Sequence, residues 1–174
     1  MDRLGTERLA LWPLAAGDAE RLHALWTDEP VRRFLWDGRA ISPEETQAIV
    51  EESARLFREH GLGLWTVRER GGEDLLGVVG YWYFRTPPSL ELLFAVAAPH
   101  WRRGIATEAS RSVIAYGFLS LGFEAIAAST DAANAASVRV LEKLGMTLRR
   151  REAVEGVDTV FYELPRPRTA ESRR

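Results

Sequence analysis

The sequence predicts a single mixed α/β domain built on a largely antiparallel sheet. Two pairs of apolar segments are joined by short glycine-containing turns, at Gly71–Asp74 and Glu155–Gly156, which is typical of β-hairpins. Amphipathic segments with helix start and stop residues stand between the other apolar segments. No internal repeat or linker divides the chain, so we expect one domain over residues 1–165 and a disordered tail over residues 166–174.

The composition is that of an ordinary soluble globular protein, and it excludes several classes of function. Of the 174 residues, 46% are hydrophobic and 28% are charged, and the net charge of −2 argues against a nucleic-acid binder. The absence of cysteine excludes a disulfide framework, a cysteine nucleophile and a thiolate zinc site. The chain has neither a signal-peptide pattern nor an apolar run of about 18 residues, so we expect a cytoplasmic protein without membrane partners.

The first half of the chain predicts one strand, then helices, then a hairpin. The clearest helix start is Ser42 to Glu45, where serine caps, proline occupies the first helical position and Glu45 completes a capping box. The expected elements are a strand at Thr6–Leu14, a helix from the Asp18 cap to Trp26, one or two helical turns in Val31–Trp36, a helix ending at His60 before Gly61, and strands at Leu62–Arg70 and Leu75–Phe84.

The second half predicts two strand–helix units followed by a hairpin. The expected elements are an apolar strand from Ser89, a helix from Ile105 to Leu121, a strand at Ala125–Thr130, a helix at Ala135–Leu144, and paired strands at Thr147–Val154 and Thr159–Leu164. Gly122 and Gly145 stand where the two helices should end.

The segment Arg102–Thr107, which we call the anion turn, joins the apolar strand to the long helix. Gly104 permits close backbone approach, Arg102 and Arg103 supply positive charge, and the first amides of a helix have no intrahelical acceptor. These features suit the phosphates of a ligand. A surface turn with solvated arginines has the same pattern, and the segment matches neither a P-loop nor a dinucleotide fingerprint.

Glu91 is the one carboxylate within the apolar strand. If the strand is buried on both faces, an ionised carboxylate there is costly, and it is suited to accept a proton from a substrate. If the strand begins at the surface, Glu91 is an ordinary exposed residue, two positions from the strand start. The residues alone leave both readings open.

Asn134 and Ser137 open the second late helix. Residues of these types at a helix start most often cap it, and the functional alternative is polar contact with a ligand between the two helices. The three histidines are scattered without the spacing of a metal site, so we expect no metal: His23, His60 and His100.

Two of these segments together resemble the GNAT superfamily of acetyl-CoA-dependent N-acetyltransferases. The strings are W-x-x-G-x-A-T-E-A from Trp101 and N-x-x-S-x-x-V-L-E-K-L-G from Asn134. They are similar to the branch that acetylates the N-termini of ribosomal proteins, and the likeness covers nearly the whole chain. The resemblance implies an α+β fold with a mixed, mostly antiparallel sheet of six to seven strands, splayed in the middle and flanked by about four helices.

The resemblance also implies where acetyl-CoA would bind. Backbone amides of the anion turn would hold its pyrophosphate, the backbone of strand residues would run beside its pantetheine arm, and Asn134 would contact it from the second helix. An N–H near Val96 would polarise the thioester carbonyl. The implied cosubstrate-binding residues are Phe94, Ala95, Val96, Arg102, Arg103, Gly104, Ile105, Ala106, Thr107 and Asn134.

For catalysis, the resemblance assigns Glu91 as general base, acting on the substrate ammonium directly or through water. Without cysteine, the acetyl group would pass directly to the amine. Many family members place a tyrosine acid where Leu141 stands here, so Ser137 becomes the group expected to protonate the departing thiolate. Trp101 replaces the Gln or Arg of many members, as is usual in the branch named above.

The acceptor implied by this branch is a protein or peptide N-terminal α-amine. A small amine, such as an antibiotic, polyamine or amino-acid derivative, is the alternative acceptor, and a non-catalytic CoA-binding module is the alternative to an enzyme. The segments that would decide are Val31–Thr46 and the turn at Val154–Asp158. A homodimer is compatible with the apolar edges of the predicted sheet.

Overall fold

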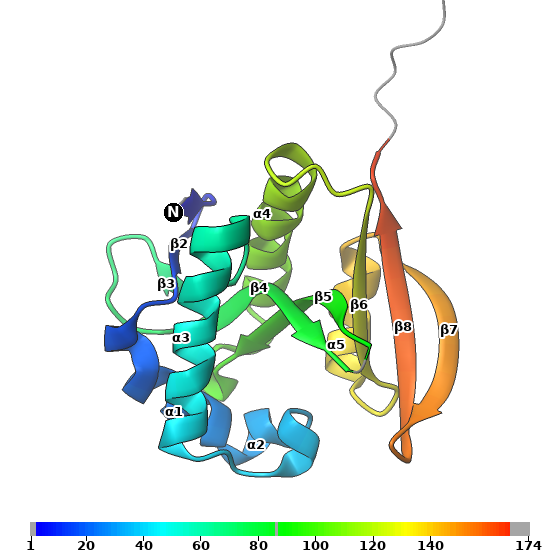
Figure 1. Cartoon of the computed structure of the whole chain (residues 1–174), viewed down its shortest axis with the longest axis horizontal. Helices are drawn as coiled ribbons and strands as arrows, with labels where there is room; N and C mark the ends of the chain where they lie inside the picture. The colour runs from blue at the N-terminus through cyan, green and yellow to red at the C-terminus, as the bar shows by residue number, and fades with distance from the viewer. Residues whose placement is uncertain (1–2, 86, 168–174) are drawn as a thin grey trace, which may run out of the picture.

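The computed structural model describes residues 3–85 and 87–167, which form one eight-stranded sheet flanked by helices (Figure 1). The strand order is β1-β2-β3-β4-β5-β6-β8-β7, and every neighbouring pair is antiparallel except β5 and β6. The strands are β1 Leu4–Gly5, β2 Leu9–Pro13, β3 Leu64–Glu69, β4 Gly77–Phe84, β5 Ser89–Val96, β6 Ala125–Asp131, β7 Thr147–Val154 and β8 Val157–Pro165. The mixed, mostly antiparallel fold is confirmed, with the two-residue β1 as the strand beyond the expected seven.

Five α-helices lie in the described residues, one more than expected. They are α1 Ala19–Thr27, α2 Glu29–Arg32, α3 Pro43–His60, α4 Ile105–Leu119 and α5 Ala135–Lys143, with short 3-10 turns at Ala16–Asp18, Trp36–Gly38 and Ala98–His100. The capping box of α3 forms, because Ser42 and Glu45 bond each other's backbone N–H groups, and Gly61 ends the helix in the left-handed region. Helix α2 begins two residues after the end of α1. Pro30 lies in its first turn, where the missing proline N–H costs no helical hydrogen bond.

Helices cover both faces of the sheet, and each face has its own core (Figure 1). On one face, which we call the α1–α3 face, α1 and the middle of α3 pack with β3, β4 and β5, while Leu56 and Phe57 near the end of α3 join the core of the opposite face. On the opposite, α4–α5 face, α4 packs on β4 and β5 while α5 packs on β6. Within the described chain, we find no helix whose length and apolar content would let it cross a membrane.

Helix α4 approaches β4 closely through Gly117. A Cβ at this position would lie 2.2 Å from the hydroxyl oxygen of Tyr81, which no real contact allows. The Tyr81 hydroxyl is buried and donates a hydrogen bond of 3.0 Å to the carbonyl of Val113, one turn earlier in α4. A glycine in the last turn of α4 is therefore required here by packing on the sheet.

The parallel pair β5–β6 is the place where the sheet opens. Strand β5 pairs with β4 over its whole length, from Ser89 to Val96, but the ladder to β6 holds one pair, Glu91 with Ala127. Helix α4 follows the carboxyl end of β5 and α5 follows that of β6. The N-termini of both helices therefore stand where the two parallel strands end, as at the ligand-binding crevice of open α/β sheets. The expected splay is present.

Candidate active site

The anion turn has the backbone of an amide cradle. Arg102 and Gly104 both lie in the left-handed region, with φ of 63° and 77°. The first helical hydrogen bond runs from the N–H of Glu108 to the carbonyl of Gly104, over 2.9 Å. The amides of residues 105–107 therefore precede the first bonded amide and have no acceptor within α4. At this end the helix dipole is positive, so the cradle suits an anion.

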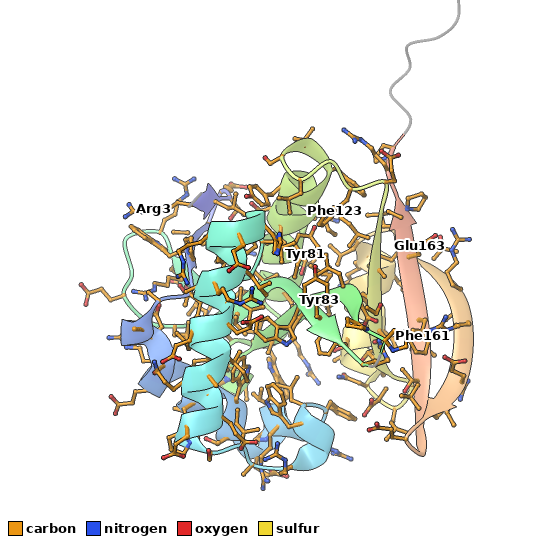
Figure 2. The ribbon with its side chains drawn as sticks, viewed as in Figure 1. Arg3, Tyr81, Tyr83, Phe123, Phe161 and Glu163 are labelled. Atoms are coloured by element: carbon orange, nitrogen blue, oxygen red, sulfur yellow. The ribbon has the colours of Figure 1, made fainter. Side chains whose placement is uncertain are left out.

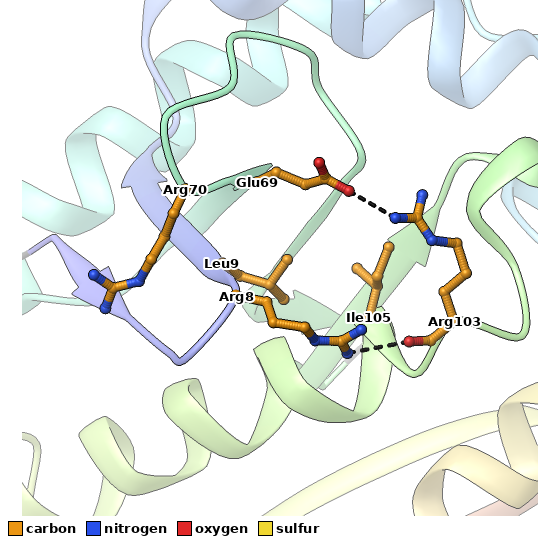
Figure 3. A pocket seen from close by; sticks show the side chains of 6 residues that line it. All are labelled: Arg8, Leu9, Glu69, Arg70, Arg103 and Ile105. Atoms are coloured by element: carbon orange, nitrogen blue, oxygen red, sulfur yellow. Dashed lines mark hydrogen bonds and ion pairs between the residues drawn. The ribbon is translucent and has the colours of Figure 1, made fainter.

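The two arginines of the turn differ in what they contact. Arg103 donates 2.7 Å to the carboxylate of Glu69 and 2.9 Å to Nδ1 of His100. It lines a cavity of about 280 Å³ together with residues of β2 and β3 (Figure 3). Its charge is matched by Glu69 in an exposed pair, with the two side chains 47% and 53% exposed. The side chain of Arg102 is also exposed, so both arginines of the turn face solvent.

Glu108 fixes the start of α4 against the N-terminal strands. Its carboxylate accepts hydrogen bonds from the hydroxyl of Thr6, from the backbone N–H of Arg8 over 3.1 Å and from Nε of Arg8 over 2.7 Å. Burial opposes the ionised form, but the bonds from Thr6 and Arg8 outweigh it and hold the pKa of the Glu108 carboxyl below its ordinary value. Arg8 also donates 3.1 Å to the carbonyl of Arg103 (Figure 3). Sequence analysis did not identify this anchor.

The open edge of β5 exposes alternate backbone groups. The N–H of Ala97 donates 2.8 Å to the carbonyl of Leu76, which directs Ala97 toward β4. Because backbone groups alternate along a strand, Ala95 also faces β4, while Phe94 and Val96 direct their N–H and C=O groups into the opening toward β6. Of the three strand residues expected beside the pantetheine arm, two therefore face the opening with their backbone, and Ala95 contributes none of its backbone groups.

Trp101 closes the end of this edge. Its indole N–H donates 2.6 Å to the carbonyl of Val96, and 47% of its surface is exposed. A carbonyl oxygen has two lone pairs, so Val96 can still accept a second hydrogen bond. The indole thereby links the end of β5 to the residue that precedes the anion turn.

Glu91 is buried, with 3% of its side chain exposed, so the reading of an exposed strand start is wrong. Arg85, from the turn between β4 and β5, pairs with both carboxylate oxygens, at 3.1 Å for the Nη2–Oε2 contact. Ser129 on β6 donates 2.6 Å to Oε2 and in turn accepts from Arg85. By this count Oε2 accepts two hydrogen bonds and Oε1 accepts one, which leaves one lone pair on Oε1.

Arg85 and Ser129 are functional candidates that the sequence analysis missed. Arg85 stands in a turn with a φ of 64°, and Ser129 lies 38 positions after Glu91. The one available signal was general: a buried carboxylate requires a counterion and hydrogen-bond donors. Which residues supply them depends on the register of β6 beside β5.

A second arginine shares an aromatic ring with Arg85. The guanidinium carbon of Arg85 lies 4.8 Å from the ring centroid of Phe161, and that of Arg150 lies 4.0 Å from it. Phe161 on β8 pairs with Ser129 on one side and with Arg150 on the other, so these side chains share the α1–α3 face. In Figure 2, Phe161 projects from β8 on the side of the β4–β5 end.

Asn134 has the capping role that its position favoured. Its side-chain oxygen accepts 3.1 Å from the N–H of Ser137, and its amide nitrogen keeps its donors. Ser137 is half-buried in the first turn of α5, and Leu141 is buried in the core. In the described residues, no group of three or more His, Asp or Glu side chains is arranged to hold a metal ion.

Strand geometry separates Glu91 from the rest of the site. At about 3.3 Å per residue, Glu91 lies about 10 Å along β5 from Phe94 and about 16 Å from Val96. The side chain of Glu91 is therefore far from the anion turn. The open edge of β5 is the element that joins the two.

The amide cradle at the start of α4 and the open edge of β5 together suit an extended ligand that carries phosphates, and the buried carboxylate of Glu91 lies farther along the same strand. Residues 8–147 match the family model described as Acetyltransferase (GNAT) domain. The chain therefore belongs to the GNAT acetyltransferase family, and it is an acyltransferase of the N-acetyltransferase type, as its resemblance implied.

The relatives agree in length and in fold. The chain is 30% identical over 172 residues to an uncharacterised N-acetyltransferase, YoaA, of Bacillus subtilis, covering 95% of this chain and 97% of that protein. A GNAT-family acetyltransferase of Bacillus anthracis has a TM-score of 0.78 at 22% identity, with 94% and 98% of the chains covered. RimL, a ribosomal L7/L12 α-N-protein acetyltransferase solved with coenzyme A, has a TM-score of 0.78 at 15% identity, with 94% and 98% covered. At these identities the solved structures establish the fold.

Proposed function

We propose that this enzyme transfers an acetyl group directly from acetyl-CoA to a primary amine, and that the preferred acceptor is the N-terminal α-amine of a peptide or protein. The observation that carries the proposal is the open edge of β5, which runs from the amide cradle to the buried Glu91. The structural likeness to RimL, whose structure holds coenzyme A, supports the cosubstrate and the acceptor class.

The residues present fit acetyl-CoA. In the proposed complex, the amides of residues 105–107, together with exposed Arg102, hold its phosphates at the start of α4. The groups of Phe94 and Val96 that face the opening pair with its pantetheine amides, as an added strand does. The amide nitrogen of Asn134 remains free to donate from α5. Arg103 pairs with Glu69 in an exposed contact, which a phosphate of the cosubstrate can replace at small cost.

The thioester carbonyl requires a hydrogen-bond donor, and the proton of the amine requires an acceptor. The amides of Phe94 and Val96 are the two donors on the open edge, and Phe94 lies nearer to Glu91. Because about 10 Å of strand separates Glu91 from Phe94, Glu91 receives the proton through water, at the free lone pair of Oε1. An α-amine, with a pKa of about 8, loses its proton more readily than a lysine side chain, with a pKa of about 10.4. Ser137 is the proposed donor to the departing thiolate, and its hydroxyl regains a proton, through water, from the second proton that the amine loses as the amide forms.

A small-molecule amine is the second candidate acceptor. The observation in its favour is the density of paired charges around Glu91, where Arg85 and Arg150 flank Phe161. A pattern of this kind can orient a compact polar substrate as well as a peptide terminus.

The test is release of free CoA thiol from acetyl-CoA with a panel of N-terminal peptides and small amines, with the acetylated product identified by mass. We expect Glu91→Gln to lower kcat about a hundredfold near neutral pH, the lower range for a lost proton acceptor, while acetyl-CoA binding is kept. Glu163→Gln, an exposed carboxylate paired with Arg149, is the matched control. Equal turnover by Glu91→Gln and wild type would refute the proton-acceptor role, and a panel without turnover would refute the transferase reaction.

A further inference from the structure

The guanidinium of Arg85 stands beside the carboxylate that would receive the proton of an acceptor. It pairs with both carboxylate oxygens, and it is the more exposed partner, at 26% of its side chain against 3% for Glu91. From the α1–α3 face, Arg85 thus covers the carboxylate. The ammonium of an acceptor that passes its proton to Glu91 through water therefore stands near a cation.

Charge decides which amines can do so. A bare ammonium beside the water that reaches Glu91 would stand near the guanidinium of Arg85, and like charges in a partly buried site repel strongly. An acceptor that also carries a carboxylate brings its own anion. That carboxylate can pair with the exposed part of Arg85 while Arg85 keeps its bonds to Glu91, so the acceptor adds no net charge to the site.

A receiving group for that carboxylate is present on the same face. Arg150 lies 4.0 Å from the ring of Phe161, the ring that Arg85 also contacts. Its ionic partner is Glu152, at 3.1 Å, and the two side chains are 60% and 51% exposed. Exposed pairs of this kind contribute little, so Arg150 can exchange Glu152 for a substrate carboxylate at small cost. A guanidinium presents donors that match a carboxylate at two points.

We propose that the acceptor is a primary amine with a carboxylate close to it: the ammonium passes its proton to Glu91 through water, and the carboxylate binds at Arg85 and Arg150. This inference rests on the proposed function and names its substrate class. The carboxylate has two sources, the α-carboxylate of a free amino acid or the acidic side chain of a residue near a peptide N-terminus.

The experiment compares matched acceptors in wild type and in Arg150→Gln. One pair is alanine and alaninamide; the other is a C-terminally amidated tetrapeptide that begins Ser-Asp and its Ser-Asn counterpart. Because amidation also changes the basicity of the amine, the readout is the ratio of kcat/KM within each pair and its change in the variant. Arg151→Gln is the control, because Arg151 neighbours Arg150 on β7, pairs with Asp158 and points to the opposite face.

We expect Arg150→Gln to lower the ratio about tenfold in one pair, through KM of the carboxylate member, and to leave its uncharged partner within about twofold. Arg151→Gln should leave both ratios as in wild type. A change in the alanine pair identifies a free amino acid, and a change in the peptide pair identifies an acidic N-terminus. Turnover without preference, or a preference that survives Arg150→Gln, overturns this inference and leaves acetyl transfer standing. The absence of turnover with any amine overturns both.

Discussion

Arg85 and Glu91 form a two-point ion pair across the turn between β4 and β5, with Ser129 bonded to both. The carboxylate is almost fully buried, and the arginine is its one cationic partner in the described structure. The pair therefore serves stability before any substrate binds. It also fixes the turn in which Arg85 adopts a φ of 64°.

We expect Arg85→Gln to destabilise the fold by roughly 3 kcal/mol, because it leaves a buried carboxylate without a counterion. Arg151→Gln, which breaks an exposed pair with Asp158, should have an effect below about 1 kcal/mol. Urea unfolding at pH 7 measures both. The double variant Arg85→Gln with Glu91→Gln should recover part of the loss, since it removes the stranded charge. Equal stability of the two single variants would mean that Glu91 is satisfied in another way.

Trp101 is expected to organise the cosubstrate edge without stabilising the fold. Trp101→Phe keeps an aromatic ring but removes the donor that holds the carbonyl of Val96. Loss of one such hydrogen bond should raise KM for acetyl-CoA about fivefold and leave kcat nearly unchanged. Trp12→Phe is the control, since Trp12 is also partly exposed but lies on β2. If Trp101→Phe binds acetyl-CoA as tightly as wild type in calorimetry, the hydrogen bond from Trp101 to the carbonyl of Val96 does not contribute to cosubstrate binding.

Several parts of this protein could be predicted from the sequence because their causes are local. Ser42 and Glu45 form the predicted capping box, and Gly61 ends α3 as expected. Gly104 likewise begins α4 from the predicted turn. Each of these outcomes depends on residues within about one helical turn of one another.

The parts that were missed depend on strand register and packing. The partners of Glu91 come from a turn and from β6, and Arg103 pairs with Glu69 across 34 positions. No local pattern encodes such pairs. Helix α2 was expected later, at Val31, because Pro30 was read as a break and not as a first-turn residue.

Acid should weaken the anchor between Glu108 and the N-terminal strands. The pKa of Glu108 is lowered in the folded state, so its contribution to stability is present above the unfolded value, near 4.3, and is lost as the pH falls through the folded value. We expect Glu108→Gln to reduce the free energy of unfolding by about 1–2 kcal/mol at pH 7, and the difference from wild type to shrink below about pH 4. Urea unfolding of both proteins at pH 7, 5, 4 and 3 measures this. A difference that stays constant over the series would show that the anchor does not depend on charge.

Gly117→Ala tests whether packing on β4 overrides helix propensity. In an exposed helix interior this change stabilises by about 1 kcal/mol, since alanine is the better helix former. In α4 the added Cβ would lie 2.2 Å from the hydroxyl of Tyr81, which is bonded to Val113. We therefore expect destabilisation by about 2 kcal/mol, as for overpacked cores. Gly17→Ala, with nothing within 4 Å of its Cβ, should be close to neutral. Adding Tyr81→Phe to Gly117→Ala removes the clashing oxygen and should restore part of the stability lost. A Gly117→Ala protein that melts at or above the wild-type temperature would mean that α4 can move away from β4 without loss.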